Sequence, residues 1–247
     1  MNESNIDYAL AFRVVERYFS ELKPILLELL KHAKMPALIE ILKEAKHYWI
    51  CKSECQAMDS VNGNAQLCTV QLDLEDSERY GIKYIDADGK KKGCIILHSS
   101  VGSIERLIYS ILETVTKTKN PCLPLWLSPI QVRIIPLSEK YLKNAERVVK
   151  KIESENIRVD IDDRTESVPK KIRDAEMSWI PMSLVIGPKE VKSKKVRVRF
   201  RKTGKIKDMK IDVFLKEIKS KLKNMPFEKL TVPKLISKRP IFVSWGE

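Results

Sequence analysis

The sequence predicts an α/β protein with an N-terminal helical segment, a partial antiparallel sheet, and then a mixed, mostly parallel α/β domain. Three observations support this. Apolar residues recur at three- and four-residue steps in residues 1–46, short β-like runs fill residues 47–98, and apolar runs alternate with helical patterns from residue 132. With 43% apolar and 32% charged residues, the composition excludes disordered and collagen-like chains.

The first 46 residues are predicted to form a helical hairpin or cap. Ile6, Leu10 and Val14 recur at four-residue steps, as on one face of a helix. Pro24 and Pro36 would each occupy the first turn of a new helix, where the missing N–H of proline has no partner to lose. Whether these apolar residues cover a domain or form a dimer surface stays open.

Residues 47–98 change to short β-like runs, two of which are predicted to pair as a hairpin. The runs 82–86 and 94–97 flank Asp88-Gly89, a dipeptide typical of tight hairpin turns. A helix follows, because apolar residues form one stripe at helical spacing over residues 104–115.

Pro121 and Pro124 mark the predicted domain boundary. Two prolines so close together end a helix and stiffen a linker. We therefore expect a first domain over residues 1–120, with a helical cap, and a second domain over residues 125–247, with a C-terminal tail.

After this boundary, apolar runs alternate with helical patterns. The runs are 132–136, 157–161 and 182–186, and the helices are a helix capped by Ser138 that ends near residue 153 and a helix over 168–177. Such alternation is typical of βαβ units with a largely parallel sheet. A strictly alternating strand over 195–201 and a helix over 211–222 complete the domain.

The formal charge of +13 is concentrated near one end of the chain. Residues 1–186 contain 27 basic and 27 acidic residues, whereas residues 187–240 contain 19 basic and 5 acidic residues. Localised positive charge favours phosphate backbones, because each neutralised phosphate releases condensed counterions. A solvated lysine-rich surface would give the same counts, so the arrangement of the charges must decide.

Cysteines and apolar segments indicate an intracellular setting. The 5 cysteines contain no CxxC pair, and we expect buried free thiols rather than a disulfide framework or a zinc cluster. The chain has no uncharged apolar run of about 18 residues, and its start does not resemble a signal peptide. We therefore predict a cytoplasmic protein.

Ligands of open α/β sheets gather at the carboxyl ends of the strands, which here selects the loops 137–139, 163–167 and 187–190. The middle loop contains Arg164 and Thr165, which suit both bases and phosphates. The structural alternative makes Thr165 a helix cap and places Arg164 in a surface ion pair.

The alternating strand is the stronger signal for nucleic-acid binding. Its apolar residues would face the core and turn three arginines to the opposite face. These are Arg197, Arg199 and Arg201. Three guanidinium groups on one strand face repel one another unless an anion lies over them. The cluster therefore favours a site for single-stranded or loop RNA.

Two residues of the first half are candidates for other chemistry. Arg106 lies in the first turn of the helix over 104–115, where a cation opposes the helix dipole, so it must reach solvent or meet an anion such as a phosphate. His98 ends a β-like run and could be a satisfied histidine or a metal ligand.

Several segments, in order, resemble archaeal-type threonyl-tRNA synthetases of class II. QLCTVQLD (66–73), ERYGIKY (78–84) and GSIER (102–106) are similar to the end of the catalytic domain, including motif 3. The segments 125–133, 163–164, 171–176, 179–181, 189–191 and 235–240 are similar to the anticodon-binding domain. The resemblance runs from about residue 57 to the end, and it implies the C-terminal part of such an enzyme.

The resemblance also implies roles for individual residues. Arg106 would contact the γ-phosphate of ATP, and Thr69 and Gln71 would line the pocket for threonine and adenylate, while His98 would bind zinc. The positions that would read anticodon bases are Thr165, Arg173, Glu190 and Arg199. ATP with Mg²⁺, zinc and tRNA(Thr) are therefore the expected cofactors and partner.

Motifs 1 and 2 of the family have no counterpart in the sequence. Because adenylate formation depends on positioning and charge stabilisation, we do not expect this chain to form threonyl-adenylate alone. The leading hypothesis is a tRNA(Thr)-binding protein that acts in aminoacylation beside a separate catalytic or editing chain or as a homodimer. The alternatives are half of an active ATP-dependent threonine–tRNA ligase, completed by a partner chain or a missing N-terminal part, and a general RNA-binding accessory protein.

Overall fold

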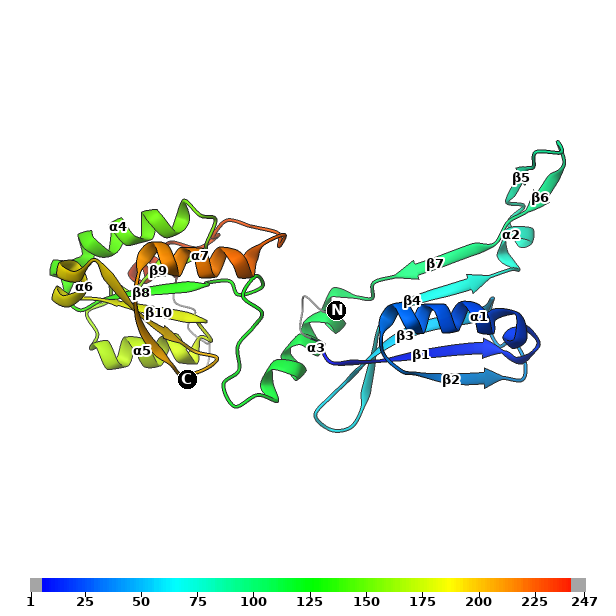
Figure 1. The fold of residues 1–247 in the computed structure, drawn as a ribbon, viewed down its shortest axis with the longest axis horizontal. Helices are drawn as coiled ribbons and strands as arrows, with labels where there is room; N and C mark the ends of the chain where they lie inside the picture. Colours follow the sequence, from blue (N-terminus) through cyan, green and yellow to red (C-terminus); the bar gives the residue numbers. More distant parts are fainter. Residues whose placement is uncertain (1–5, 241–247) are drawn as a thin grey trace. The chain divides into compact units, whose positions relative to one another are not determined.

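The computed structural model describes residues 6–240, in two compact units, Met1–Lys117 and Thr118–Glu247. The outermost residues of the predicted domains, 1–5 and 241–247, lie outside the described part. Each unit contains its own five-stranded sheet (Figure 1). Within residues 6–240, no helix is both long enough and apolar enough to cross a membrane.

The sheet of the first unit has the order β2-β1-β3-β4-β7. The strands are β1 (Tyr8–Val15), β2 (Ala37–Leu42), β3 (Trp49–Met58), β4 (Asn64–Asp73) and β7 (Ile96–Ser100). Only β1 and β2 pair in parallel, because helix α1 (Glu16–Ala33) connects them. Leu26 of α1 packs on Phe12 and Val14 of β1, so this helix covers one face of the sheet (Figure 1).

The prediction that the first 46 residues are helical is wrong for two segments, which form the strands β1 and β2. A four-residue step such as that from Leu10 to Val14 fits a helix, but it is also two periods of a strand. Phe12, midway between them, faces α1 as well, which shows the two-residue period. Pro24 lies inside α1 rather than in its first turn, and Pro36 precedes β2 rather than a helix.

The predicted hairpin around Gly89 is confirmed, but its second strand was placed wrongly. Strand β5 (Lys83–Ile85) pairs with β6 (Lys91–Gly93), and residues 96–100 form β7 beside β4 instead. A tight turn pairs the residues that directly flank it. The return strand therefore begins at Lys91, before the apolar run at 94–97. A short helix, α2 (Asp76–Arg79), precedes the hairpin.

Helix α3 (Ile104–Thr116) confirms the predicted helix, yet much of its apolar stripe is exposed. Ile111 and Val115 are buried. Ile104, Ile108 and Leu112 are 73%, 52% and 42% exposed. The stripe therefore has more apolar surface than the described unit covers.

The sheet of the second unit has the order β12-β11-β10-β8-β9 and is mixed. Strands β8 (Val132–Pro136), β9 (Val159–Ile161) and β10 (Met182–Ile186) are parallel to one another. Strands β11 (Lys195–Phe200) and β12 (Ile206–Lys210) continue the sheet in antiparallel fashion. The predicted mixed α/β class is confirmed, although β12 was not predicted.

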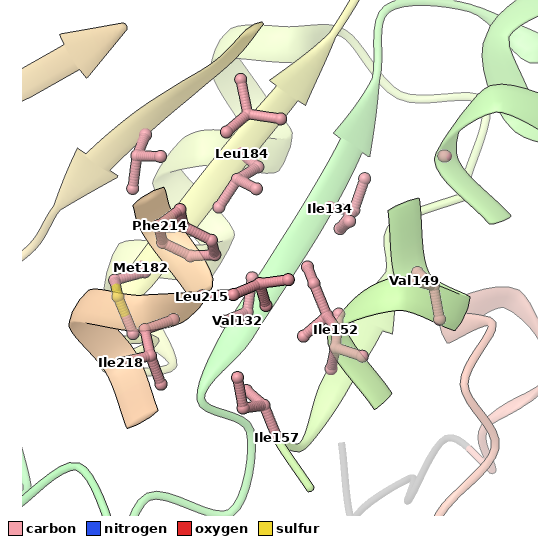
Figure 2. Packing of buried hydrophobic residues seen from close by; sticks show 14 of the residues in the cluster. Val132, Ile134, Val149, Ile152, Ile157, Met182, Leu184, Phe214, Leu215 and Ile218 are labelled. Carbon is pink, nitrogen blue, oxygen red and sulfur yellow. The ribbon is translucent and has the colours of Figure 1, made fainter. Parts of the chain in front are cut away.

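Helices cover both faces of this second sheet (Figure 1). Helices α4 (Leu142–Glu153) and α7 (Ile211–Leu222) pack on one face, where Ile152 and Phe214 are fully buried against Val132 and Leu184 (Figure 2). Helix α5 (Val168–Met177) lies on the other face (Figure 1). The predicted helices over 168–177 and 211–222 are confirmed.

Smaller details of the prediction need correction. Ser138 makes no side-chain capping bond, and a 3-10 turn, η2 (Glu139–Tyr141), precedes α4. Strand β9 begins at Val159 rather than at residue 157. A short helix, α6 (Pro188–Ser193), and a 3-10 turn, η3 (Ile236–Lys238), were not predicted. The cysteines are free, as expected, but they are half-buried rather than buried.

A buried ion pair joins β8 and β9 on the face of the second sheet that α5 covers. Arg133 of β8 donates two hydrogen bonds to the carboxylate of Asp160 in β9, at 3.0 and 2.8 Å. Asp160 is fully buried and also lies 2.9 Å from the guanidinium of Arg239. The pair fixes the register of β8 and β9, because both partners occupy opposite positions of the ladder.

We expect Arg133→Ala to lower the free energy of unfolding by about 3 kcal/mol, because it leaves a buried carboxylate without its bidentate partner. Urea denaturation followed by circular dichroism measures the change. Lys170→Ala is the control, since its ion pair with Glu166 is exposed and its removal should cost less than about 0.5 kcal/mol. Equal effects of the two substitutions would contradict a structural role for the buried pair.

Candidate nucleic-acid interface

The three loops selected from the sequence lie at one edge of the second sheet. They follow β8, β9 and β10, which are neighbouring parallel strands, so their carboxyl ends meet. The N–H of Leu137 donates to the carbonyl of Ile186 at 2.9 Å and ties the first loop to the end of β10, where the third loop begins. A Cβ atom on Gly187 would come within 2.1 Å of the side chain of Leu137, so a larger residue here would require that side chain to move.

Arg164, in the middle loop, is held by two carboxylates. Its guanidinium donates to Asp162 at 2.8 Å and to Asp174 of α5 at 2.9 Å. Hydrogen bonding to Asp162 raises the pKa of Arg164. Burial would raise the pKa of Asp162, but its hydrogen bonds and its attraction to Arg164 and Lys171 lower it. The ion pair expected by the structural alternative is therefore present.

Thr165 is exposed at the tip of this loop and does not cap α5. The N-cap residue is Ser167, whose side chain makes no capping bond either. The capping role expected for Thr165 is wrong, because the helix begins two residues later. The hydroxyl group of Thr165 therefore does not cap α5.

The alternating strand has the predicted faces, since Val196 and Val198 of β11 are buried. The predicted mutual repulsion of its arginines is wrong, because each has a partner within the protein. Arg197 donates to Asp208 of β12 at 2.9 and 3.0 Å, and Arg199 donates to Glu176 of α5 at 2.7 Å. Arg201, just after the strand, donates to the carbonyl of Pro121 at 2.6 Å.

Glu190 and Arg173 differ in how they are held. The carboxylate of Glu190 accepts a hydrogen bond from the N–H of Gly187 at 3.0 Å, which caps α6 and fixes the side chain. Arg173 of α5 is exposed and has no ion-pair partner within residues 6–240. Arg173 is therefore available to a ligand without breaking a contact.

The first unit carries polar side chains on the sheet face that α1 leaves uncovered. Cross-strand pairing aligns Arg13, Lys52, Gln71 and His98 in one row across β1, β3, β4 and β7. Thr69 lies in the neighbouring row, opposite Glu54 of β3 and Ser100 of β7. A largely antiparallel sheet commonly packs one face on its core and leaves the other face polar, so this face is open to solvent or to a ligand.

Contacts within this polar face connect the expected residues. The amide of Gln71 donates to the hydroxyl of Thr69 at 3.3 Å, and the hydroxyl of Tyr48 donates to the carbonyl oxygen of Gln71. The ring of Tyr48 lies edge-on to His98, with ring centroids 5.1 Å apart. Glu54, 1% exposed, forms an ion pair with Lys52 at 2.6 Å.

His98 adjoins two carboxylates. Its Nε2 lies 2.9 Å from Asp73, and one ligand atom from each of His98, Asp73 and Asp76 lies within 4.8 Å of the others. One imidazole and two carboxylates match in number the three protein ligands of a catalytic zinc site. Asp73 also accepts hydrogen bonds from the N–H groups of Glu75 and Asp76. Zinc binding here stays a prediction.

The pKa values of the two carboxyl groups in this cluster are shifted in opposite directions. Burial would raise the pKa of Asp73, but hydrogen bonds from the backbone N–H of Asp76 and from His98 outweigh it and lower the pKa to about 2. Burial and the neighbouring Asp73 raise the pKa of Asp76.

Arg106 reaches the rim of the polar face. Its guanidinium donates to the carbonyl of Gln66 at 3.2 Å, and its backbone N–H is capped by the hydroxyl of Ser103. Arg106 and Arg13 line one cavity of about 450 Å³ together with polar residues of β3 and β4. Arg13 is paired with Glu40 at 2.8 Å and with Glu54 at 3.6 Å, whereas Arg106 has no ion-pair partner within residues 6–240 and is the cation available to an anionic ligand.

Residues 131–221 match the family model of the anticodon binding domain. Over 241 residues the chain is 45% identical to the threonine–tRNA ligase of Pyrococcus horikoshii, a match that covers 96% of the chain and 39% of that relative. The threonine–tRNA ligase of Staphylothermus marinus is 40% identical over 239 residues. The chain thus spans about two fifths of the length of these curated relatives.

The chain contains an anticodon-binding domain of the threonyl-tRNA synthetase family. Among solved structures it is similar to the RNA binding domain of threonyl-tRNA synthetase from Cryptosporidium parvum, with a TM-score of 0.72 and 25% identity over 91% of the chain and 56% of that structure. A prolyl-tRNA synthetase from the same organism shares the fold, with a TM-score of 0.63 and 23% identity over 74% of the chain and 39% of that structure.

Of the expected base-reading residues, Thr165 and Glu190 follow the carboxyl ends of β9 and β10, Arg173 lies on α5, and Arg199 lies on β11 opposite Ser183, near the amino end of β10. What sequence reasoning missed are the carboxylates that orient the arginines, above all Glu176 and Asp208. Glu176 is 23 residues away from Arg199 in the sequence, and Asp208 lies on β12, which was not predicted. In the first unit it missed Tyr48, Lys52 and Glu54, although the alternation of Lys52 and Glu54 was a visible signal.

We expect the stability of the first unit to fall as the pH is lowered from about 5 to about 2, partly through Asp73. Its folded pKa of about 2 lies below its ordinary value of 3.8, so ionised Asp73 stabilises the fold above the ordinary pKa, and this contribution is lost as pH falls through the folded pKa. Urea unfolding at several pH values measures the slope. Asp73→Asn should flatten it, whereas Glu105→Gln, at an exposed position, should not.

Proposed function

We propose that the anticodon-binding domain binds the anticodon loop of tRNA(Thr) in aminoacylation, at the carboxyl edge of β8, β9 and β10. The observation that supports this most directly is that partners within the protein orient an acceptor and a donor, Glu190 at that edge and Arg199 on β11, opposite Ser183 near the amino end of β10. Arg199 is fixed by Glu176, and Glu190 by the N–H of Gly187. We place this activity in the cytoplasm.

Fixed side chains are suited to read unpaired bases. A guanidinium has five N–H donors, so Arg199 keeps donors for a base after it binds one carboxylate. Glu190 has a second carboxylate oxygen that can accept from an exocyclic amine. Because both are already oriented, binding costs little conformational entropy. Arg164, Arg197 and Arg201 then hold this framework, while Thr165 and Arg173 contact the RNA.

We expect Arg173→Ala and Arg199→Ala each to weaken binding to tRNA(Thr) by about 1–3 kcal/mol, as for loss of one base contact. Fluorescence anisotropy with tRNA(Thr) and with a non-cognate tRNA measures both affinity and specificity. Arg173 has no ion-pair partner within residues 6–240, so Arg173→Ala should leave the unfolding midpoint unchanged. Lys170→Ala, one turn away on α5, serves as control. Equal binding of all tRNAs by the unaltered protein would favour the general RNA-binding accessory role instead.

A second candidate function is supported by the polar sheet face of the first unit. We propose that this face, with Thr69, Gln71 and Arg106, forms part of an ATP-dependent threonine–tRNA ligase site that further protein segments complete. The exposed apolar residues of α3 support this, because contiguous exposed apolar surface marks a surface that another segment or chain covers. The occupant would be a missing N-terminal part, a separate catalytic or editing chain, or a second copy.

This second function has a separate test. The chain alone should not exchange pyrophosphate into ATP when threonine is added, because motifs 1 and 2 are missing. Arg106→Ala should abolish any ATP binding measured by isothermal titration with Mg²⁺, since it removes the cation of the cavity that forms no ion pair within residues 6–240. Glu105→Gln is the control in the same helical turn. Robust threonine-dependent exchange by the chain alone would contradict the proposed incompleteness.

A further inference from the structure

We propose that the anticodon-binding domain has a second RNA subsite, between α4 and α6, for the sugar-phosphate backbone of a single-stranded segment next to the bases read at the carboxyl edge. A cavity of about 400 Å³ lies here. Its cationic residues are Arg147 and Lys151 of α4 and Lys194 and Lys195 after α6. The inference rests on the proposed tRNA binding and extends it to a surface that the base-reading residues do not explain.

The cations of this subsite differ from Arg164 in the loop after β9 and from the arginines of β11. Arg164, Arg197 and Arg199 are each paired with a carboxylate, so much of their charge is compensated. The four cations around the cavity are exposed, and none has an ion-pair partner in the described part of the chain. Phosphate binding gains from uncompensated charge, because only such charge replaces the condensed counterions of the RNA.

The floor of the cavity is apolar, and this distinguishes it from a plain basic surface. Val148, Ile186, Val191, Val196 and Ile211 line it. A nucleotide has an apolar base or ribose face and an anionic phosphate, so a basic rim over an aliphatic floor fits both parts. Asn144 adds an amide at the rim that can donate or accept a hydrogen bond.

The cavity is continuous with the proposed base-reading site. Glu190 lines the cavity and also belongs to the loop at the end of β10, and Ile186 is the last residue of that strand. A single-stranded segment that places a base on Glu190 therefore reaches the cavity with an adjacent nucleotide. An acidic peptide would satisfy the cations as well, but it would gain nothing from this continuity, so we favour RNA.

The test compares two double substitutions on the same helix. Arg147→Ala with Lys151→Ala removes two cations of the cavity, and Lys143→Ala with Lys150→Ala removes two exposed lysines of α4 that do not line it. Alanine favours helices, so both variants should keep α4. The probe is an anticodon stem-loop of tRNA(Thr), and the measurement is its dissociation constant over a range of KCl concentrations.

We expect the cavity variant to reduce the slope of log Kd against log salt by about 0.7 for each cation removed, as for single-stranded contacts, and the control variant to leave the slope unchanged. Val191→Glu, which places a carboxylate at the floor, should also weaken stem-loop binding. A duplex RNA without a loop should bind the unaltered protein and the cavity variant equally.

Three results would overturn the subsite. If the cavity and control variants gave equal slopes of log Kd against log salt, the cations of the cavity would contribute only to the diffuse positive charge of the domain. Unchanged stem-loop binding in the cavity variant, together with weakened binding by Arg173→Ala, would remove the subsite but keep the proposed function. If the cavity variant lost binding to a polyglutamate peptide but bound the stem-loop as tightly as the unaltered protein, the cavity would be assigned to an acidic protein partner. If the unaltered protein bound stem-loop and duplex equally, the proposed tRNA function would itself fail.

Discussion

The pairing of arginines with carboxylates organises the second unit. Arg133 and Asp160 join two parallel strands within the sheet, and Arg164 and Arg199 tie a loop and a strand to α5. A buried or half-buried guanidinium needs such a partner or carbonyl acceptors, as Arg201 has in Pro121, because desolvation of an unpaired charge costs several kcal/mol. The same pairs leave donors free in fixed directions, so one interaction stabilises the fold and prepares the surface for a polar ligand.

Two kinds of positive charge therefore coexist in this domain. Paired arginines provide geometry, which suits the recognition of bases, and unpaired lysines provide net charge, which suits phosphates. The surplus of basic residues in 187–240 belongs mainly to the second kind, because most of these nineteen basic residues form no ion pair within residues 6–240, even though Glu153, Glu155 and Glu176 pair with some of them. Among the five acidic residues of 187–240, Asp208 is paired with Arg197 and Glu190 caps its own helix.

The first unit shows a different balance. Helix α1 supplies a hydrophobic cluster to one face of the sheet, and the opposite face holds charged and amide side chains that satisfy one another, as Lys52 and Glu54 do. Polar groups at low exposure demand such internal partners. The exposed apolar residues of α3 show that part of the apolar surface of this unit is not covered within the unit itself.

The sequence by itself determined the class of the second unit and the bounds of β8, β10, α5 and α7, and it predicted an edge for ligands that stays a prediction. These follow from local patterns, since apolar period and loop position are properties of adjacent residues. It failed at β1, where a four-residue step fits both helix and strand, and at the arginines of β11, whose partners come from other elements. Only the tertiary structure decided which cations are compensated and which are free, because an ion pair such as Arg199 with Glu176 joins residues that meet only when α5 packs on the sheet.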